Sequence, residues 1–318
     1  MIEKKNIFWE RELVQKILFS LHREQMKERK LKIILKILRI SFFIAIASFF
    51  IFKFSSVRKH LNFQNKPSPH VAYINIQDEI SSGTLSDTDH IVPCIKNAFD
   101  NPYVKAIILR INSPGGSPVQ SGRIYSAIQF EKKLHPEKKI YSVIDEMGLS
   151  GAYYIASITD KIYADNASLI GSIGVISSSF GFSSFMEKIG VERRSITAGK
   201  NKDFLDPFLP LNKNSEIFWK KVLDNTHQQF IYAVKKGRGK RLKNDSDLFS
   251  GLIWNGEQAK KIGLIDGIGS IESVARDEIK ETNLVDYSPE IGVLHEIGHR
   301  IKMQIIKNIH QLMSIKIF

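Results

Sequence analysis

The chain has 318 residues, 43% of them hydrophobic and 25% charged, a composition typical of a globular protein rather than a disordered or fibrous one. Its net charge of +13 lies mostly in residues 1–54, which hold 12 Lys and Arg against 5 Asp and Glu, so the mildly basic remainder argues against nucleic-acid binding. The single cysteine, Cys94, excludes an intramolecular disulfide and a cysteine-based metal site.

The first predicted element is a transmembrane anchor at residues 33–54. The run from Ile40 to Phe52 carries no charge, and extending it back to Ile33 gives the ~20 residues that a membrane span needs. A buried core helix would show a polar face, which this run lacks. A cleaved signal peptide normally starts near residue 1, whereas this run starts about forty residues into the chain. We therefore expect an uncleaved anchor.

Basic residues on the two sides of the anchor predict its orientation. Eleven Lys and Arg precede Ile40, and only four follow Phe52 within about twenty residues. Because the more basic side is expected in the cytoplasm, residues 1–32 are predicted to be a basic cytoplasmic segment and residues 55–69 a linker. The chain is thus predicted to be a single-pass protein of the inner (cytoplasmic) membrane. Its body is expected outside the cytoplasm, which is the periplasm if the source is a Gram-negative bacterium.

The body, residues 70–290, alternates between apolar strand-like runs and segments with helical spacing. We expect strands at 71–76, 104–111, 140–144, 171–177 and 192–197, and helices at 118–133, 150–157, 182–189 and 214–236. Strands that alternate with helices predict an α/β fold with a mainly parallel sheet and right-handed crossovers.

Three loops that follow predicted strands hold the candidate catalytic residues. They span residues 112–116, 146–154 and 198–203. Because functional sites of open α/β sheets gather at the carboxyl ends of the strands, the three loops are expected to lie together.

Ser150 is the candidate nucleophile. The sequence Gly-Leu-Ser-Gly-Ala around it nearly matches the G-x-S-x-G turn that exposes a serine hydroxyl between a strand and a helix. Small residues also occur where a strand and a helix only pack closely, which is the alternative interpretation. No histidine after Ser150 has the sequence context of a triad partner. A lysine shielded in an apolar pocket is the other possible base, and the loop with Lys200 and Lys202 has apolar neighbours.

The motifs together resemble the signal peptide peptidase A (protease IV) family of serine peptidases. The resemblance rests on Leu-Ser-Gly-Ala-Tyr-Tyr-Ile-Ala at Ser150, on Ser-Pro-Gly-Gly upstream and on Gly-Lys-Asn-Lys-Asp-Phe-Leu-Asp-Pro-Phe downstream. It extends from about Val71 to Ala275. It implies a ClpP/crotonase-like α/β fold, a Ser–Lys dyad without a cofactor, and cleavage of remnant signal peptides in or near the membrane.

The resemblance also implies roles for individual residues. The nucleophile corresponds to Ser150 and the base to Lys202, because the family lysine stands five residues before the proline of this loop, here Pro207. Lys200 is then a bystander, and Ser172 corresponds to a serine that positions the lysine amine. Larger members of the family carry two copies of this domain, whereas this chain carries one. The resemblance therefore implies a homo-oligomeric ring in which Ser150 of one subunit meets Lys202 of the next.

The loop from Ser113 to Gly116 resembles the family segment that supplies an oxyanion-hole N–H. Gly115 and Gly116 are the candidates, and the backbone around Ser150 and Gly151 is expected to supply the second donor. Donors of this kind contribute about 10²–10³ in rate. The alternative is a tight turn that needs glycine for its backbone alone. The family usually has glycine at the position of Ala152, and the added methyl group disfavours a positive φ there.

A zinc-protease motif near the end of the chain is a second candidate site. His295 to His299 match H-E-x-x-H, whose two histidines share one face of a helix. No Asp or Glu follows Glu296, and the position of a third histidine is Ile305, so we expect no metal. The surrounding residues 291–318 form a basic amphipathic tail, expected to pack as a helix on the body or on a neighbour, or to lie on a membrane surface.

Three functions compete for this sequence. The leading hypothesis is a membrane-anchored serine endopeptidase that degrades cleaved signal peptides and other small membrane-proximal peptides. A non-catalytic membrane scaffold on the same fold is the alternative, which the presence of both Ser150 and Lys202 disfavours. Acyl-CoA chemistry on the related crotonase fold is disfavoured by the anchor and by the Ser–Lys pair.

Overall fold

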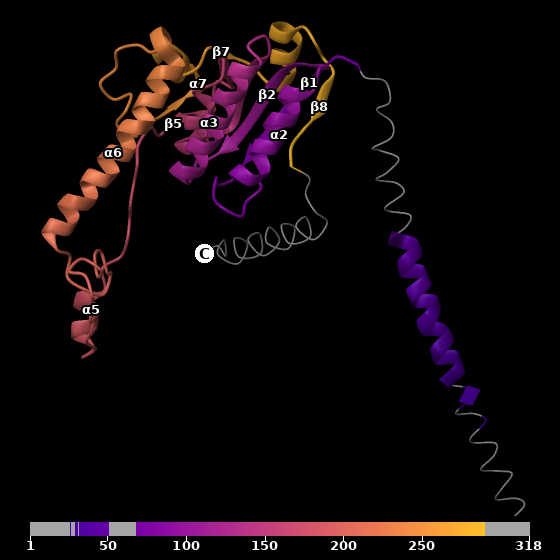
Figure 1. Cartoon of the computed structure of the whole chain (residues 1–318), viewed down its shortest axis with the longest axis horizontal. Coiled ribbons are helices and arrows are strands. Elements are labelled where there is room, and N and C mark those ends of the chain that lie inside the picture. The colour runs from indigo at the N-terminus through magenta and orange to yellow at the C-terminus, as the bar shows by residue number, and fades with distance from the viewer. Residues whose placement is uncertain (1–25, 27–28, 31, 51–67, 290–318) are drawn as a thin grey trace, which may run out of the picture. The chain divides into compact units, whose positions relative to one another are not determined.

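The computed structural model describes residues 26, 29–30, 32–50 and 68–289 (Figure 1). The chain forms two compact units, Met1–Pro67 and Ser68–Phe318. Most of the predicted basic segment, the predicted linker up to residue 67 and the tail with the His295–His299 motif lie outside the described residues.

The first unit contains a helix from Lys32 to Phe50. Its mean hydropathy is 2.2, and in the described residues it is the one helix long and apolar enough to cross a membrane. Aliphatic and aromatic side chains around its whole circumference are exposed, so it is not a core helix of the described structure.

The second unit is a layered α/β domain around one sheet. Its strands are β1 His70–Gln77, β2 Val104–Ser113, β3 Lys139–Leu149, β4 Lys161–Ala164, β5 Leu169–Gly171, β6 Ile253–Asn255, β7 Gly267–Ile268 and β8 Leu284–Asp286. Its helices are α2 Thr88–Asp100, α3 Pro118–Leu134, α4 Gly151–Ala156, α5 Ser183–Lys188, α6 Lys213–Arg238, α7 Gly256–Ile262 and α8 Ile271–Ser273, with a 3₁₀ turn η1 Gly239–Arg241 and a π-helical turn η2 Val274–Ile279.

The sheet has the strand order β6-β5-β3-β2-β1-β8, and β4 joins β3 to β7. Every pairing is parallel except that of β5 with β6. The long strand β3 pairs with β4 through its first half and with β5 through its second half. The prediction of an α/β fold with a mainly parallel sheet is therefore confirmed.

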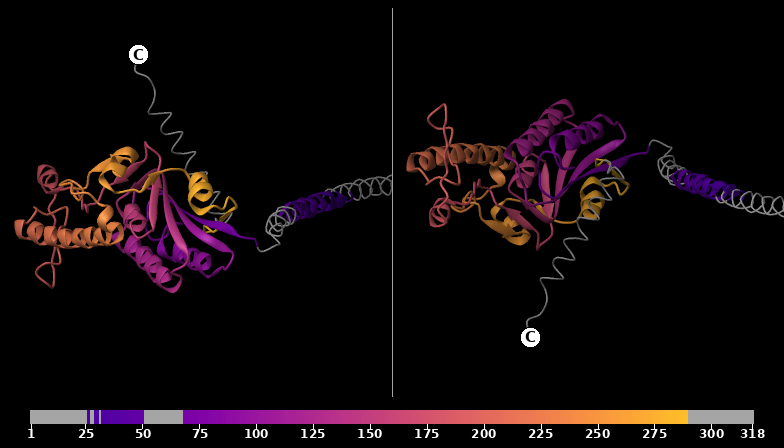
Figure 2. Two further views of the ribbon diagram at one scale, coloured as in Figure 1. Left: turned by 90° about the horizontal axis from the view of Figure 1, so that it is seen from above. Right: turned by 90° about the horizontal axis from the view of Figure 1, so that it is seen from below.

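Both faces of the sheet are covered, which explains why β2 is an almost continuous apolar run. Alternate residues of β2 face opposite layers: Ile107 and Leu109 pack with α2, α3 and α4, whereas Ala106 and Ile108 pack with α8 and η2. Figure 2 shows α2 and α3 on one side of the strands and the yellow α8–η2 segment on the other. Packing on both faces holds the strands in place, and the predicted site lies at the carboxyl ends of these strands.

Two of the predicted strands are wrong. Residues 171–177 were expected to be a strand, but β5 ends at Gly171 because Ser172 turns the chain with φ +51° and donates its N–H to Leu252 O. Residues 192–197 are exposed and form no strand, and no described strand pairs with them. The helices predicted at 182–189 and 214–236 are confirmed as α5 and α6.

A long segment between β5 and the second half of α6 projects from the body. We call residues 176–225 the arm; it contains α5 and the first half of α6, which project from the body in Figure 1. No residue of the arm is buried. Aromatic contacts hold it together: the ring of Phe182 stacks on that of Phe208, and Phe204 packs edge-on against Trp219.

Candidate active site

Ser150 lies in the turn between β3 and α4 in a backbone conformation that is rare for serine. Its φ is +50° and its ψ is −122°. Hydrogen bonds enforce this conformation from both sides, because the Ser150 N–H donates to Gly171 O at 2.9 Å and the Ser150 C=O accepts from the Tyr154 N–H at 2.9 Å. Residues held in sparsely populated φ/ψ regions cluster at active sites, so the turn supports a functional role for Ser150.

Helix α4 is anchored directly behind this turn. Tyr153 is fully buried, and its hydroxyl donates to Leu264 O at 2.7 Å. Burial also raises the pKa of Tyr153. Ala152 is buried inside α4 and is not among the residues with positive φ, so its methyl group leaves the turn geometry undisturbed.

The loop after β2 lies against the Ser150 turn and has no room for side chains. A Cβ on Gly115 would lie 2.7 Å from Gly151 N, and one on Gly116 would lie 2.3 Å from Ile80 O. Their φ angles are +97° and +149°. The loop is fixed because Ile80 N–H donates to Gly115 O and Ser117 N–H donates to Ile80 O, both at 2.8 Å.

Two backbone N–H groups in these loops are available as donors. Within the described residues, the Gly116 N–H makes no backbone hydrogen bond outside regular elements. The Gly151 N–H stands in the first turn of α4, where no intrahelical acceptor exists. The two backbones are close, since a Cβ on Gly151 would lie 3.4 Å from Gly116 N. The N–H of Ser150 is occupied by Gly171 O, which leaves Gly116 and Gly151 as the candidate pair.

Ser172 is brought next to the Ser150 turn. It follows Gly171, whose carbonyl accepts the Ser150 N–H, and it is partly exposed. Its own φ is +51°, so two serines in unfavourable conformations stand on neighbouring strand ends.

Lys202 is not brought to Ser150 within one chain. It lies in a turn of the arm, where its N–H donates to Gly199 O at 3.0 Å, and its side chain is exposed. Lys200 is exposed as well. The apolar shielding that a lysine base needs is therefore not supplied to Lys202 by its own chain.

A cavity of about 680 Å³ opens beside Ser150. Its apolar wall includes Val92, Val119, Tyr154 and Phe230, and Gly116 and Gly151 also line it. Tyr154 packs on Phe230 with ring centroids 4.9 Å apart. The sequence did not identify Phe230 as a residue of the cavity, because the apolar spacing of α6 indicates only that Phe230 faces the core. Among the described residues, no group of side chains suited to hold a metal lies in this cavity.

Comparison with known proteins matches much of the body to one family. The model of peptidase family S49 matches residues 132–285, which include Ser150, Ser172 and Lys202. A candidate protease of Synechocystis sp. is 30% identical over 210 residues, which are 66% of this chain and 73% of that protein. The chloroplastic serine protease SPPA of Arabidopsis thaliana is 28% identical over 190 residues, 59% of this chain and 28% of that protein.

A relative with a different name is also similar. The Na(+)/H(+) antiporter NhaA of Brucella abortus is 45% identical over 205 residues, 63% of this chain. The aligned segment spans 27% of that protein's length. Most of the protein that carries the antiporter name therefore lies outside the segment that aligns with this chain.

Proposed function

Because the chain belongs to the signal peptide peptidase A family, peptidase family S49, we propose that it is a membrane-anchored endopeptidase with Ser150 as nucleophile and Lys202 as general base. Membership makes the chain a serine peptidase with a ClpP-like, mainly parallel α/β fold. The observation that carries the proposal is the strained turn of Ser150 beside the free N–H groups of Gly116 and Gly151.

The proposed reaction is acyl transfer through Ser150. Its Oγ attacks the peptide carbonyl while the neutral Lys202 amine accepts the hydroxyl proton. The N–H groups of Gly116 and Gly151 stabilise the oxyanion of the tetrahedral intermediate. Collapse releases the amine, which takes the proton from Lys202, and water then hydrolyses the acyl-enzyme. Ser172 orients the lysine amine by accepting a hydrogen bond.

The lysine is proposed to come from a second copy of the chain. Lys202 is exposed on the arm, and Ser150 lines a cavity whose wall does not include Lys202. The arm also exposes a row of large apolar side chains, of a kind that marks interaction surfaces: Ile176, Phe180, Phe182, Phe185, Ile189, Val191, Ile196, Phe208, Leu211, Ile217, Phe218 and Val222. A ring of subunits would cover these side chains and shield Lys202 from water.

The proposed substrates are signal peptide remnants and other short apolar peptides at the membrane. The cavity beside Ser150 has an apolar wall that includes Val92, Val119 and Phe230, which suits apolar side chains of a signal peptide. The helix Lys32–Phe50 supports anchoring of the enzyme in the same membrane. The charge distribution around that helix supports an extracytoplasmic body and an inner-membrane location.

The test is peptide hydrolysis by the detergent-solubilised full chain. Wild type is expected to cleave signal-peptide sequences, and Ser150→Ala and Lys202→Ala to lose at least about 10³-fold in kcat/KM. Lys200→Ala is the matched control and is expected to keep its activity. Wild type without hydrolysis would leave the scaffold alternative as the better description.

Mixing the two inactive variants tests the shared site. If Ser150 and Lys202 of one site come from different chains, hybrid assemblies of Ser150→Ala with Lys202→Ala contain some intact sites and recover part of the activity. Each variant alone stays inactive. A mixture that remains silent while the two variants co-assemble would place both residues of a site on the same chain.

A further inference from the structure

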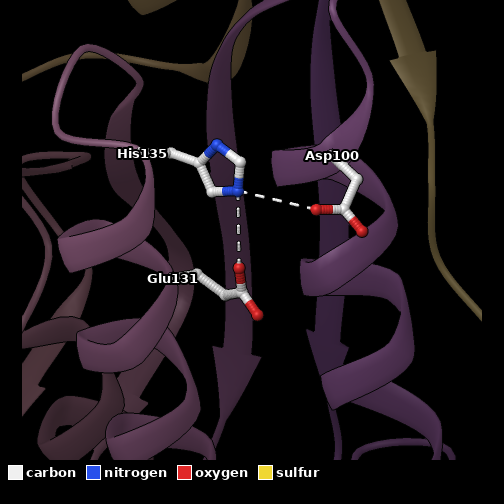
Figure 3. Close-up of side chains that lie close together, drawn as sticks. All are labelled: Asp100, Glu131 and His135. Carbon is white, nitrogen blue, oxygen red and sulfur yellow. Dashed lines mark ion pairs between the residues drawn. The ribbon is translucent and has the colours of Figure 1, made fainter.

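We propose that Asp100, Glu131 and His135 form a binding site for a divalent transition metal ion such as Zn²⁺, remote from Ser150. Asp100 is the last residue of α2, Glu131 lies in the last turn of α3, and His135 follows α3. Figure 3 shows the three side chains converging between the ends of these two helices. One ligand atom from each lies within 4.8 Å of the others.

His135 forms ion pairs with both carboxylates that are longer than hydrogen bonds, and this spacing also suits ligands around a metal ion. His135 Nε2 lies 3.5 Å from Asp100 Oδ1 and 3.8 Å from Glu131 Oε2. A charge-assisted hydrogen bond would bring these atoms to about 2.7–2.9 Å. Zn²⁺ bonds of ~2.0–2.2 Å in tetrahedral geometry separate neighbouring ligand atoms by roughly 3.3–3.5 Å. A small contraction of the cluster would therefore close it around a metal ion.

Glu131 is an independent indication of a missing ligand. Its side chain is 9% exposed, and within the described residues its buried Oε2 makes no hydrogen bond. Burying a carboxylate oxygen without a partner is costly. Figure 3 shows that the carboxylate faces His135, so a cation at the centre of the cluster would satisfy it.

The local field favours a cation at this point. The carboxyl-terminal ends of α2 and α3 both face the cluster, and each carries partial negative charge. The nearby ammonium of Lys138 donates to the carbonyl oxygens of Phe99 at 2.6 Å and Asn101 at 2.8 Å, not to a carboxylate of the cluster. The charge of Lys138 acts on Asp100, but its hydrogen bonds are made to backbone oxygens and not to the two acidic side chains.

His135 has carboxylates near both ring nitrogens. Its other ring nitrogen, Nδ1, lies 3.9 Å from a carboxylate oxygen of Glu137, which is within ion-pair range but too far for a hydrogen bond. The ring of Phe99 stacks on the imidazole with centroids 5.8 Å apart. An imidazole together with carboxylates favours Zn²⁺ over Ca²⁺ or Mg²⁺, which prefer oxygen ligands alone.

The site would stabilise the fold rather than take part in peptide hydrolysis. Asp100 and His135 precede β2 and β3, whereas Ser113 ends β2 and Ser150 follows β3, at the opposite ends of these strands. A metal ion would fasten the end of α2 to the end of α3 at the point where both strands begin.

The experiment uses the chelator-treated full chain with His295→Ala and His299→Ala, which removes the two histidines of the zinc-protease motif. Calorimetric titration is expected to give one Zn²⁺ per chain, and Co²⁺ to give the visible absorption of a tetrahedral site. Zn²⁺ at 100 times its Kd is expected to raise the Tm by roughly 5–10 °C. Hydrolysis by folded enzyme is expected to be unchanged, so this test is separate from that of the peptidase.

Substitutions identify the ligands. Asp100→Asn, Glu131→Gln and His135→Gln are each expected to weaken Zn²⁺ binding at least tenfold, because even second-shell changes cost about 10–100-fold. Asp100 is half exposed, so its variant keeps the test valid should Glu131→Gln fold poorly. Asp224→Asn, on an exposed helical pair, is the control and should bind normally. Zn²⁺ binding that is absent, weaker than Ca²⁺ binding, or unaffected by Asp100→Asn and His135→Gln would overturn the proposal.

Discussion

A Cβ placed on Gly115 would lie 2.7 Å from the Cβ of Ser150. The two residues stand at the ends of the neighbouring strands β2 and β3, so the proposed oxyanion loop and the nucleophile turn touch through their backbones. A side chain at position 115 therefore does not fit between the two loops. The absence of a Cβ at Gly115 is what lets the loop with the Gly116 donor approach the turn of Ser150 this closely.

Gly115→Ala is expected to lower kcat/KM by about 10²–10³, because the added methyl group must displace the Gly116 N–H from the site. Gly122→Ala is the matched control. Gly122 lines the same cavity within α3 but has open space around it. Its substitution should keep activity and stabilise the helix by about 0.5–1 kcal/mol. Equal activity of the two variants in a peptide assay would contradict this account of the loop.

Ser150→Gly is expected to be more stable than Ser150→Ala by about 1 kcal/mol. Glycine adopts the φ of +50° without strain, and this relief exceeds its entropic cost in the unfolded chain. Both variants lack the nucleophile and should be equally inactive. Urea unfolding of the two proteins measures the difference, and a less stable Ser150→Gly would show that the turn is not strained.

Asp266→Asn is expected to destabilise the body by about 3–5 kcal/mol at neutral pH, because it leaves the fully buried Arg238 without its partner. Burial alone would raise the pKa of Asp266. Its pKa is nevertheless held below the usual range by the 2.6 Å hydrogen bond from Arg238 and the positive charge of Arg238, with smaller contributions from the Ile162 N–H and Arg241. Glu257→Gln, in an exposed pair with Lys261, is the control and should change the urea midpoint little.

The pair of Arg238 and Asp266 also makes the stability of the wild-type protein depend on pH. The folded pKa of Asp266 lies below its unfolded value of about 3.9, so the stabilisation is complete above that pH and is lost as pH falls through the folded pKa. The difference between wild type and Asp266→Asn should therefore shrink below about pH 4. A constant difference from pH 7 to pH 3 in urea titrations would contradict the assignment.

Ile196→Glu is expected to abolish hydrolysis by preventing association, while the Tm of the dissociated chain stays unchanged. Ile196 is fully exposed on the arm, so its replacement removes no intrachain packing. Phe130→Glu changes another large exposed apolar side chain, on α3 and away from the arm, and should remain active and associated. Sedimentation of both variants in detergent reports the assembly, and an associated but inactive Ile196→Glu would contradict the expected role.

The fold of the body could be predicted because its central strands are buried on both faces. A largely apolar run such as Val104–Ser113 is stable as a central strand that is covered on both faces. The spacing of apolar residues around Ile124 predicts the helix there. The strand expected at 171–177 failed because branched residues favour an extended backbone without specifying a partner. Ile173 is buried, yet the hydrogen bonds of its neighbours go to Leu252 and to the local turn.

The parts of the candidate site that consist of a short sequence motif could be predicted. Contacts between residues that are far apart in the sequence could not. The turn around Ser150 and the glycines at 115 and 116 lie where the loop positions indicated. Pairs such as Asp100 with His135 or Arg238 with Asp266 have no local signature, because the residues meet only after the chain has folded. The exposure of Lys202 was equally unpredictable, since apolar neighbours in sequence do not guarantee a pocket.

The arm makes the proposed enzyme sensitive to its own abundance. A single chain carries Ser150 and Lys202 but holds the lysine in water, away from the cavity. Specific activity should then rise with the density of chains in the membrane and fall on dilution, and sparse chains would stay dormant. Crowding of subunits in the bilayer would thus act as the on-switch of proteolysis, without an inhibitor or a propeptide.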